Sequence, residues 1–337
     1  MFLMDSKVQN RSTKGDPILV ALPAACTDEL KAVEFMEAQR WGGQPACPRC
    51  GSVDVYAMKD KTGEKRQADF RWLCRDCKKA GIKAQFTVRT NTVFEDSKIP
   101  LRHWCFAYWR AATSKKGVSA LEIHRQTGLC YKSCLFMLHR IRFGMSGSAP
   151  EMLGGGGRDV EVDETYIGGR ARYVGKAEMG RPGPKSNKPC VMALVERGGS
   201  VKAMLAGSVT GKTFKQYVLE NVDRSARILT DEASHYWRIG EHFDRGHESV
   251  KHHRHEYVRR GTDIHSNTVE GFFSIVKRGL DGIYHSVSKK HLPLYLNEFT
   301  YRYNRRHLED GPRVVGAIKA GEGKRLLYKS PVSGKTE

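Results

Sequence analysis

The sequence predicts a multidomain α/β protein, and three observations lead to this fold class. Two C-x-x-C pairs stand among short β-like pieces between residues 45 and 95. Helical periodicity follows over residues 98–148. After "GGGG" at 154–157 the pattern changes to strands rich in Val, Ile, Leu and Ala, and two helices close this region. We therefore expect a small cysteine-rich domain, a helical domain and an α/β domain with a mixed sheet.

Composition narrows the class of partner. A length of 337 residues suggests two or more domains, and 39% hydrophobic with 28% charged residues is typical of globular chains. The formal net charge of +20 indicates a polyanionic partner such as nucleic acid, and the alternative is a basic protein without one. The first residues lack the apolar region of a signal peptide, and no apolar run reaches the roughly 18–20 residues of a membrane span. We expect a cytoplasmic protein.

The N-terminal region is expected to contain a flexible segment (1–25) and then a domain over residues 26–96. This domain begins with a short helix over 27–41, for which Thr27 is the expected N-cap. Its β-like pieces are "VDVYAM", "FRWLC" and "AQFTV".

Four cysteines in this domain have the spacing of a metal site. They are Cys47, Cys50, Cys74 and Cys77, in two knuckles about 23 residues apart. Each knuckle turns two thiolates to one side, and four thiolates complete the tetrahedral, closed coordination of a structural Zn²⁺. The alternative is a redox C-x-x-C, which two pairs in a β-rich domain argue against. The remaining cysteines are expected to be buried small residues: Cys26, Cys105, Cys130, Cys134 and Cys190.

Residues 98–148 are predicted to form a helix-turn-helix domain. A first helix covers 100–117, and "SALEIHRQTGLCYKSCLFMLHRI" (119–141) contains two more, separated by a turn at Gly128. Leu121 is expected on the inner face of the earlier helix, with Cys134, Leu138 and Ile141 on that of the later one. The DNA readers would be Tyr131, Lys132 and Ser133 at the start of the last helix. A three-helix bundle that does not bind DNA gives the same pattern.

The α/β domain is predicted over residues 158–308, after a flexible joint at 154–157. Its strands are "RDVEVDETYIGG", "CVMALVER", "SVKAMLAGSV" and "ARILTD", and its helices cover 211–222, 266–280 and 288–305. The Gly-, Pro- and Arg-rich segment 169–188 is either a phosphate-binding loop or a solvated hairpin tip. Residues 309–337 are expected to be a featureless basic tail.

Three acidic residues are candidates for one metal site. Asp163 and Asp231 lie at the ends of two predicted strands, and Glu270 lies on the helix that begins near residue 266. Acids gathered at one sheet edge repel one another unless a cation lies between them, and Mg²⁺ prefers oxygen ligands. Lys277, two turns after Glu270, would neutralise a DNA phosphate. The alternative is a helix whose polar stripe faces solvent.

Together these motifs resemble a known family. "WGGQPACPRCGS", "VEVDETYIGG", "ILTDE" and "HSNTVEGFFSIVKRG" are similar to segments of the ISXO-like DDE transposases of bacterial insertion sequences, which carry an N-terminal zinc ribbon. The resemblance covers about residues 25–310. It implies an RNase H-like catalytic domain that cuts and joins transposon ends, with Asp163, Asp231 and Glu270 holding two Mg²⁺ or Mn²⁺ ions.

The resemblance also extends to further residues and partners. Asn267 is either the alternative third ligand or a residue that supports the ligands, because family members can show Asn in this signature. Lys277 and Arg278 are expected to contact DNA. Double-stranded DNA and a homodimer or higher oligomer on it are the implied partners, in a cytoplasmic, nucleoid-associated setting. The rival interpretations are a DNA-binding regulator without catalysis and an inactive transposase remnant.

Neighbouring polar residues leave alternatives open. Glu164 and Glu232 follow the two aspartates and either assist a metal or face solvent. Glu161 is a spare ligand candidate on the same strand face as Asp163. His265 could orient a water or a phosphate, and His252, His253 and His255 either contact phosphate or are solvated. The basic run 302–306 either holds DNA or is a basic helix end favoured by the helix dipole.

Overall fold

The computed structural model describes residues 15–168, 188–231, 236, 238–250 and 262–327. The chain divides into two compact units. Unit 1 comprises Met1–Thr113, Ala120–Gly144 and His307–Glu337, and unit 2 comprises Ser114–Ser119 and Met145–Arg306. The mixed α/β fold class is confirmed. No helix among the described residues is long and apolar enough to cross a membrane.

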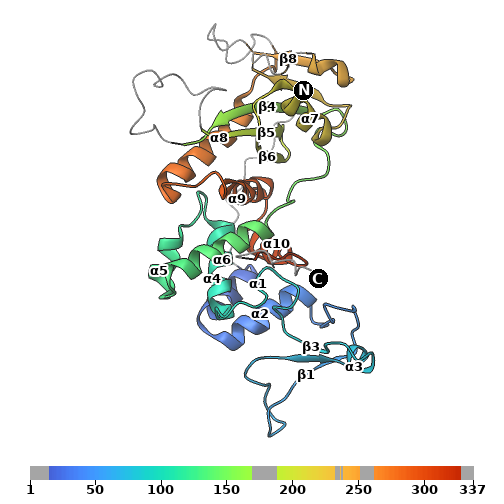
Figure 1. Cartoon of the computed structure of the whole chain (residues 1–337), viewed down its shortest axis with the longest axis vertical. Coiled ribbons are helices and arrows are strands. Elements are labelled where there is room, and N and C mark those ends of the chain that lie inside the picture. Colours follow the sequence, from blue (N-terminus) through green and yellow to red (C-terminus); the bar gives the residue numbers. More distant parts are fainter. Residues whose placement is uncertain (1–14, 169–187, 232–235, 237, 251–261, 328–337) are drawn as a thin grey trace, which may run out of the picture. The chain divides into compact units, whose positions relative to one another are not determined.

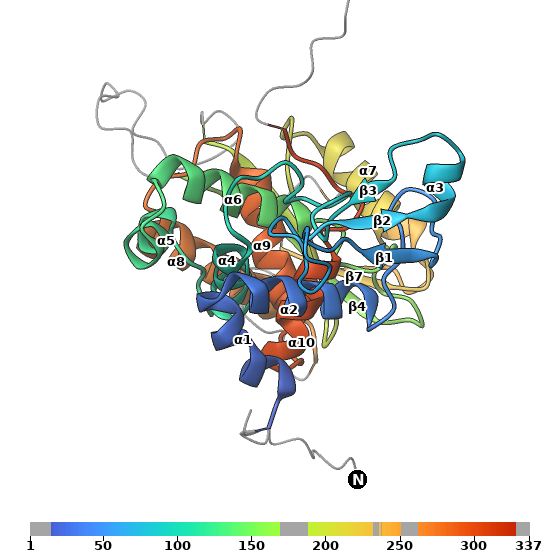
Figure 2. The same cartoon turned by 90° about the horizontal axis from the view of Figure 1, so that it is seen from below.

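Unit 1 is a helical core with a small sheet attached. Its longer helices are α1 (Pro17–Thr27), α2 (Glu29–Trp41), α4 (Leu101–Thr113), α5 (Ala120–Thr127), α6 (Tyr131–Gly144) and α10 (Asp310–Lys319). α4 packs against α1, α2, α6 and α10, so it is the central helix of the unit (Figure 2). Trp104 and Tyr108 on α4 are fully buried, as their helical spacing predicts.

The prediction of a flexible segment through residue 25 is wrong for its second half. Asp16 caps α1 by accepting the N–H of Ile18 at 2.9 Å, and Pro17 fits the first helical turn because that position needs no N–H donor. Leu22 and Ala25 of α1 are buried. The cap of α2 is Asp28, which accepts the Lys31 N–H at 2.8 Å. Thr27 was the wrong cap by one residue, because it still belongs to α1.

The predicted basic tail is also partly wrong. Residues 310–319 form α10, which contacts α1, α2, α4 and α6. Val314, Ala317 and Ile318 are spaced on one helical face and are buried there. This apolar face is short and lies among charged residues and glycines, so the sequence pattern does not distinguish it from a tail.

The cysteine-rich part is a three-stranded antiparallel sheet. Its strands are β1 (Val55–Ala57), β2 (Trp72–Cys74) and β3 (Gln85–Phe86), and the short helix α3 (Arg75–Lys79) follows β2 (Figure 2). Trp41 of α2 packs edge-on against Trp72 and Phe86, with ring centroids 5.9 and 6.0 Å apart. The three predicted β pieces therefore form strands as expected.

Helices α5 and α6 surround a turn at Gly128, whose φ of +72° suits glycine. Cys134, Leu138 and Ile141 are buried as predicted. Leu121, however, is 51% exposed, and Ile123 and Ala120 supply the inner face of α5 instead. The inner face was therefore assigned to the wrong residue of α5, although both helices exist.

Unit 2 contains a mixed five-stranded sheet in the order β6-β5-β4-β7-β8. The strands are β4 (Asp159–Tyr166), β5 (Cys190–Glu196), β6 (Val201–Leu205), β7 (Arg227–Thr230) and β8 (His247–Ser249). β5 is antiparallel to β4 and β6, whereas β4, β7 and β8 are parallel. The mixed sheet predicted for this domain is therefore confirmed. The polar three-residue strand β8 was not predicted.

Helices cover both faces of this sheet (Figure 1). α7 (Gly211–Asn221) buries Phe214 and Val218 against Val160, Val162 and neighbours on one face. On the other face, α8 (Asn267–Gly279) packs against β4 and β5, and α9 (Leu292–Asn304) against β6. A π-helical segment, Leu280–Tyr284, continues α8.

The four glycines at 154–157 are an integral part of unit 2. Leu153 bridges to Val222, and the Gly154 N–H donates to Glu196 at 2.7 Å. A Cβ on Gly154 would lie 2.5 Å from that of Ala226, so the close approach requires glycine. The flexible joint expected here is therefore wrong. The boundaries of a ribbon and a helix-turn-helix domain within residues 26–148 stay a prediction.

Candidate active site and zinc site

The four predicted cysteines converge in unit 1. Their sulfur atoms all lie within 4.8 Å of one another, and the Cys47–Cys77 and Cys50–Cys74 sulfurs are 3.7 and 3.6 Å apart. A tetrahedral Zn²⁺ with Zn–S bonds of about 2.3 Å separates its sulfur ligands by about 3.8 Å. In the part of the chain that the structure describes, no other group of three His, Cys, Asp or Glu side chains is so close. The donor set fits Zn²⁺.

Local hydrogen bonds shape both knuckles. The Cys47 N–H donates to the Ser52 carbonyl at 2.8 Å, and the Gly51 N–H donates to the Cys47 carbonyl at 2.8 Å. Gly51 has a φ of +75°, which closes the first knuckle. In the second, the Cys77 N–H approaches the Cys74 sulfur at 3.4 Å, at the start of α3. The fold thus presents all four thiols toward one point.

Strand register brings the two predicted aspartates together in unit 2. Val162 of β4 is paired with Thr230 of the parallel strand β7. Asp163 is the next residue of β4, in the middle of that strand, and Asp231 directly follows the carboxyl end of β7, so the two aspartates lie side by side. The two aspartates are therefore neighbours, but the prediction that Asp163 ends its strand is wrong, because β4 continues to Tyr166.

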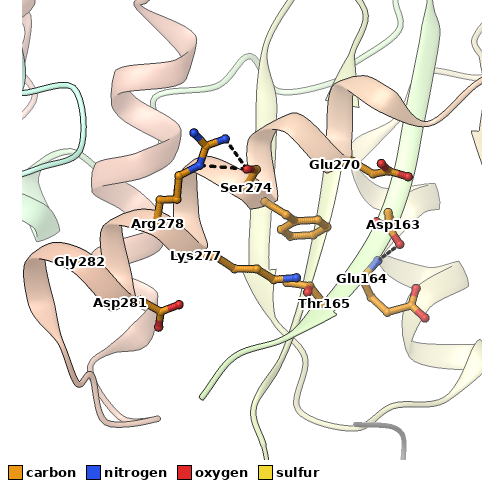
Figure 3. A pocket seen from close by; sticks show the side chains of 10 residues that line it. Asp163, Glu164, Thr165, Glu270, Ser274, Lys277, Arg278, Asp281 and Gly282 are labelled. Carbon is orange, nitrogen blue, oxygen red and sulfur yellow. Dashed lines mark hydrogen bonds between the residues drawn. The ribbon is translucent and has the colours of Figure 1, made fainter. Parts of the chain in front are cut away.

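Glu270 reaches the same place from α8. The apolar face of α8 includes Val269 and Phe273, and it packs on the sheet face that contains Ala193, the cross-strand partner of Asp163. Figure 3 shows the carboxyl groups of Glu270 and Asp163 on the same side of the site. An open cavity of about 800 Å³ is lined by Asp163, Glu164, Thr165, Glu270, Phe273, Ser274, Lys277, Arg278, Asp281 and Gly282.

Burial and the neighbouring acids change the pKa of Asp163. Burial and then the charge of Asp231 raise the pKa of Asp163 well above its usual value, and the charges of Glu164 and Glu270 add to the effect. A hydrogen bond from the Glu164 N–H, at 2.8 Å, acts in the opposite direction. Such a group of acids is destabilised without a cation and is suited to bind one.

Comparison with known proteins identifies the family. A model described as an ISXO2-like transposase domain matches residues 152–304, and one described as a transposase zinc-ribbon domain matches residues 27–80. Together they cover more than half of the chain. The chain belongs to the ISXO2-like transposases with an N-terminal zinc ribbon. An uncharacterized protein in transposable element ISH50 of Halobacterium salinarum is 29% identical over 284 residues, which cover 81% of this chain and 90% of the relative.

The two candidates for the third residue of the transposase site differ in position. Glu270 lines the cavity, and one of its carboxylate oxygens accepts the Ser266 hydroxyl at 3.2 Å. Asn267 is exposed at the first position of α8, and its backbone N–H meets His265 Nδ1 at 3.3 Å. Asn267 does not line the cavity. The geometry favours Glu270.

Two neighbouring glutamates have other contacts. Glu161 is fully buried and bonded to the start of α8, so it is not accessible as a spare metal ligand. Glu164 lines the cavity and accepts the Tyr236 hydroxyl at 2.5 Å. Burial and the charge of Glu164 raise the pKa of Tyr236 well above its usual value. Tyr236 was not predicted, because nothing in the sequence relates it to a residue 72 positions earlier.

The predicted DNA contacts are exposed to different extents. Lys277 and Arg278 are exposed at the end of α8 and line the cavity, and Figure 3 shows Lys277 extending from α8 toward β4. Tyr131 and Lys132 are exposed at the start of α6, and Ser133 is half-buried. These exposed positions leave the side chains of Tyr131, Lys132, Lys277 and Arg278 accessible to DNA.

Other candidates need correction or cannot be placed. In the basic run 302–306, Arg302 is buried and paired with Glu298, whereas Arg306 bonds the Gly199 carbonyl at 2.9 Å. Cys130 is exposed, contrary to prediction, while Cys105, Cys134 and Cys190 are buried. Several residues lie outside the described part of the chain: Glu232, His252, His253, His255 and nearly all of the basic loop, 169–187.

The raised pKa of Asp163 gives a prediction about stability. Between the ordinary pKa of Asp, about 4, and the raised value, the folded state binds more protons than the unfolded state, so stability falls as the pH rises through this window. Asp163→Asn is therefore expected to raise the melting temperature at pH 7–8 without added divalent cations. A gain of about 1 kcal/mol corresponds to about 2–4 °C.

Thermal unfolding across pH checks this expectation. The difference between Asp163→Asn and wild type should shrink as the pH falls toward about 4, because both side chains are then neutral. A melting temperature for the variant below that of wild type at every pH would contradict the repulsion among the acids.

Proposed function

We propose that this transposase binds the ends of its element and cleaves and joins DNA strands with two divalent metal ions. The single observation that carries the proposal is the approach of Asp163, Asp231 and Glu270 to one another from the middle of β4, the end of β7 and α8. The oxygen donors of these residues suit Mg²⁺ or Mn²⁺. Two such ions, when bound, would supply activation of the attacking oxygen and stabilisation of the leaving one.

The chemistry proceeds in two displacements at phosphorus. Water first bonds to the phosphorus at the element end while the P–O3′ bond breaks, which leaves a 3′-hydroxyl. The 3′ oxygen then bonds to a phosphorus of target DNA as the P–O3′ bond there breaks. The three acids would hold the metal ions, and Lys277, exposed in the same cavity, would bind a neighbouring phosphate. No covalent protein–DNA bond is required.

Recognition of the ends is assigned to unit 1. The exposed positions of Tyr131 and Lys132 at the start of α6 support contact with the major groove or its phosphates, together with Ser133. The ribbon domain is a second DNA-binding part. We further propose that a dimer or higher oligomer holds paired ends, by analogy with transposases in general.

A nicking assay tests the function. Supercoiled plasmid bearing the element ends is incubated with the protein and Mg²⁺, and nicks are mapped by primer extension. We expect nicks at the ends with wild type, loss of nicking with Glu270→Ala, and retained nicking with Asn267→Ala. The opposite pattern for these two variants would replace Glu270 by Asn267 as the third residue.

The rival is a regulator, or an inactive remnant, that binds the ends without cutting them. The charge of +20 and the helix-turn-helix pattern suit it equally well. Tight end binding by wild type without any nicking, with both Mg²⁺ and Mn²⁺, would favour this rival over the enzyme.

Lys277→Ala is expected to weaken DNA binding uniformly across sequences. The loss of one phosphate contact lowers the slope of log K against log salt by about 1. Lys212→Ala is the matched control, because Lys212 is also exposed but belongs to α7, on the opposite face of the sheet. Fluorescence anisotropy at several salt concentrations measures the slope for each variant. Equal slopes for the two variants would show that Lys277 does not contact a DNA phosphate.

A further inference from the structure

Glu161 is a fully buried carboxylate on β4 that binds the first turn of α8. One of its oxygens accepts the N–H groups of Thr268 and Val269, at 2.8 and 3.0 Å. The other accepts the Thr268 hydroxyl at 2.8 Å. The N-cap residue of α8, Ser266, makes no side-chain cap bond, so Glu161 satisfies helix N–H groups that a local cap usually would.

Arg197 completes this arrangement from the residue after β5. Its Nε donates to Glu161 at 2.7 Å, which balances the buried charge. Its two terminal nitrogens donate to the carbonyls of Asp263 and His265, at 2.7 and 2.9 Å. The chain that leads into α8 is thereby bonded to the same carboxylate–guanidinium pair as the helix itself.

The bonded positions are adjacent to the candidate metal ligands. Glu161 stands two residues before Asp163, on the same face of β4, at a distance of about 6.6 Å along the strand. Val269 immediately precedes Glu270. The Glu161 carboxylate therefore connects the β4 backbone near Asp163 to the α8 backbone beside Glu270. The two connected segments are more than 100 residues apart in the sequence.

We propose that Glu161 is a positioning residue that sets the separation of Asp163 and Glu270 for divalent-metal binding. This inference rests on the proposed function, because it assumes that these two acids share metal ions. Because Glu161 is fully buried and its carboxylate is bonded to α8 and Arg197, it acts through the ligands and not as one of them. It fixes the start of α8 over β4, and groups that orient metal ligands in this way affect affinity by about 10–100-fold.

The test measures Mn²⁺ binding to the full-length protein without DNA, by electron paramagnetic resonance of free Mn²⁺. Glu161→Gln places an amide N–H opposite the Arg197 donor and removes the charge at the helix start. Thr268→Val is a milder variant, which deletes one hydrogen bond. Glu196→Gln is the matched control: Glu196 is a buried acid on β5 that accepts the Gly154 N–H and pairs with Arg158, without contact to α8.

We expect Glu161→Gln to raise the Mn²⁺ dissociation constant about tenfold, Thr268→Val to raise it roughly threefold, and Glu196→Gln to leave it unchanged. Hydrogen exchange at the start of α8 should accelerate in the first two variants only. If Glu161→Gln does not fold, Thr268→Val decides. Wild-type Mn²⁺ affinity in the variants, with faster exchange at α8, would reduce Glu161 to a structural residue and overturn the proposal.

The same measurements separate this inference from the proposed function. If wild type and Asp163→Asn bind Mn²⁺ equally weakly, the acids hold no metal, and both proposals fail. If Asp163→Asn loses Mn²⁺ binding but Glu161→Gln retains it, the metal site stands and only the positioning role fails.

Discussion

Replacement of Asp163 by Asn should lower Mg²⁺-dependent nicking at element ends by at least about 10³-fold, with end binding within about twofold of wild type. Asp163 is the acid on which the charges of Asp231, Glu164 and Glu270 converge. A metal ion supplies several kcal/mol of transition-state stabilisation, and each 1.4 kcal/mol is about tenfold in rate. Initial rates on supercoiled plasmid, beside gel-shift measurements on an end fragment, separate catalysis from binding.

Asp223→Asn is the control for this substitution. Asp223 lies in the turn before β7, whereas Asp231 follows the other end of that strand, and the Asp223 side chain bonds Ser225. The control should nick at the wild-type rate. If Asp163→Asn nicks DNA at a rate within tenfold of wild type, the assignment of Asp163, Asp231 and Glu270 as the catalytic centre is wrong.

Removal of zinc should unfold the ribbon and abolish end binding. Binding energies of structural zinc sites are about 10–16 kcal/mol, more than a domain of this size can replace with its small apolar core of Phe86, Trp72 and neighbours. Chelation, or Cys74→Ser, is expected to release about one zinc per chain and to expose residues 45–80 to hydrogen exchange. Metal analysis and exchange mass spectrometry measure these two effects.

Cys26→Ser provides the comparison for the zinc experiment. Cys26 is a half-buried thiol on α1, outside the four-cysteine group. This variant should keep the full zinc content and the protected ribbon. Loss of zinc from Cys26→Ser, or retention by Cys74→Ser, would contradict the assignment of the four ligands.

Much of the fold could be predicted where a feature depends on residues that are close together in the sequence. The spacing of Cys47, Cys50, Cys74 and Cys77 already contains the knuckle geometry, because each pair is closed by its own turn. The proximity of Asp163 and Asp231 needed only the pairing of two apolar strands, although Asp163 lies within β4 and not at its end. The helical spacing of Val269, Phe272, Phe273 and Val276 fixed which side of α8 faces the sheet.

The remainder depended on tertiary contacts that periodicity does not encode. Glu161 looked like a possible ligand because strand alternation places it beside Asp163, yet only the position of α8 shows that it binds backbone N–H groups. Tyr236 contacts Glu164 across the site in the same non-local way. The apolar face of α10 is three residues long, too weak a pattern to distinguish from a tail.

The location of α10 has a consequence for the order of folding. Val314, Ala317 and Ile318 belong to the helical core that starts at Pro17, although the whole of unit 2 separates them from it in the sequence. Domains generally fold as they leave the ribosome, N-terminal first. Here the sheet-containing unit can be completed during synthesis while the helical core still lacks one of its helices, so polypeptides released before residue 310 would contain the acids without a finished helical core.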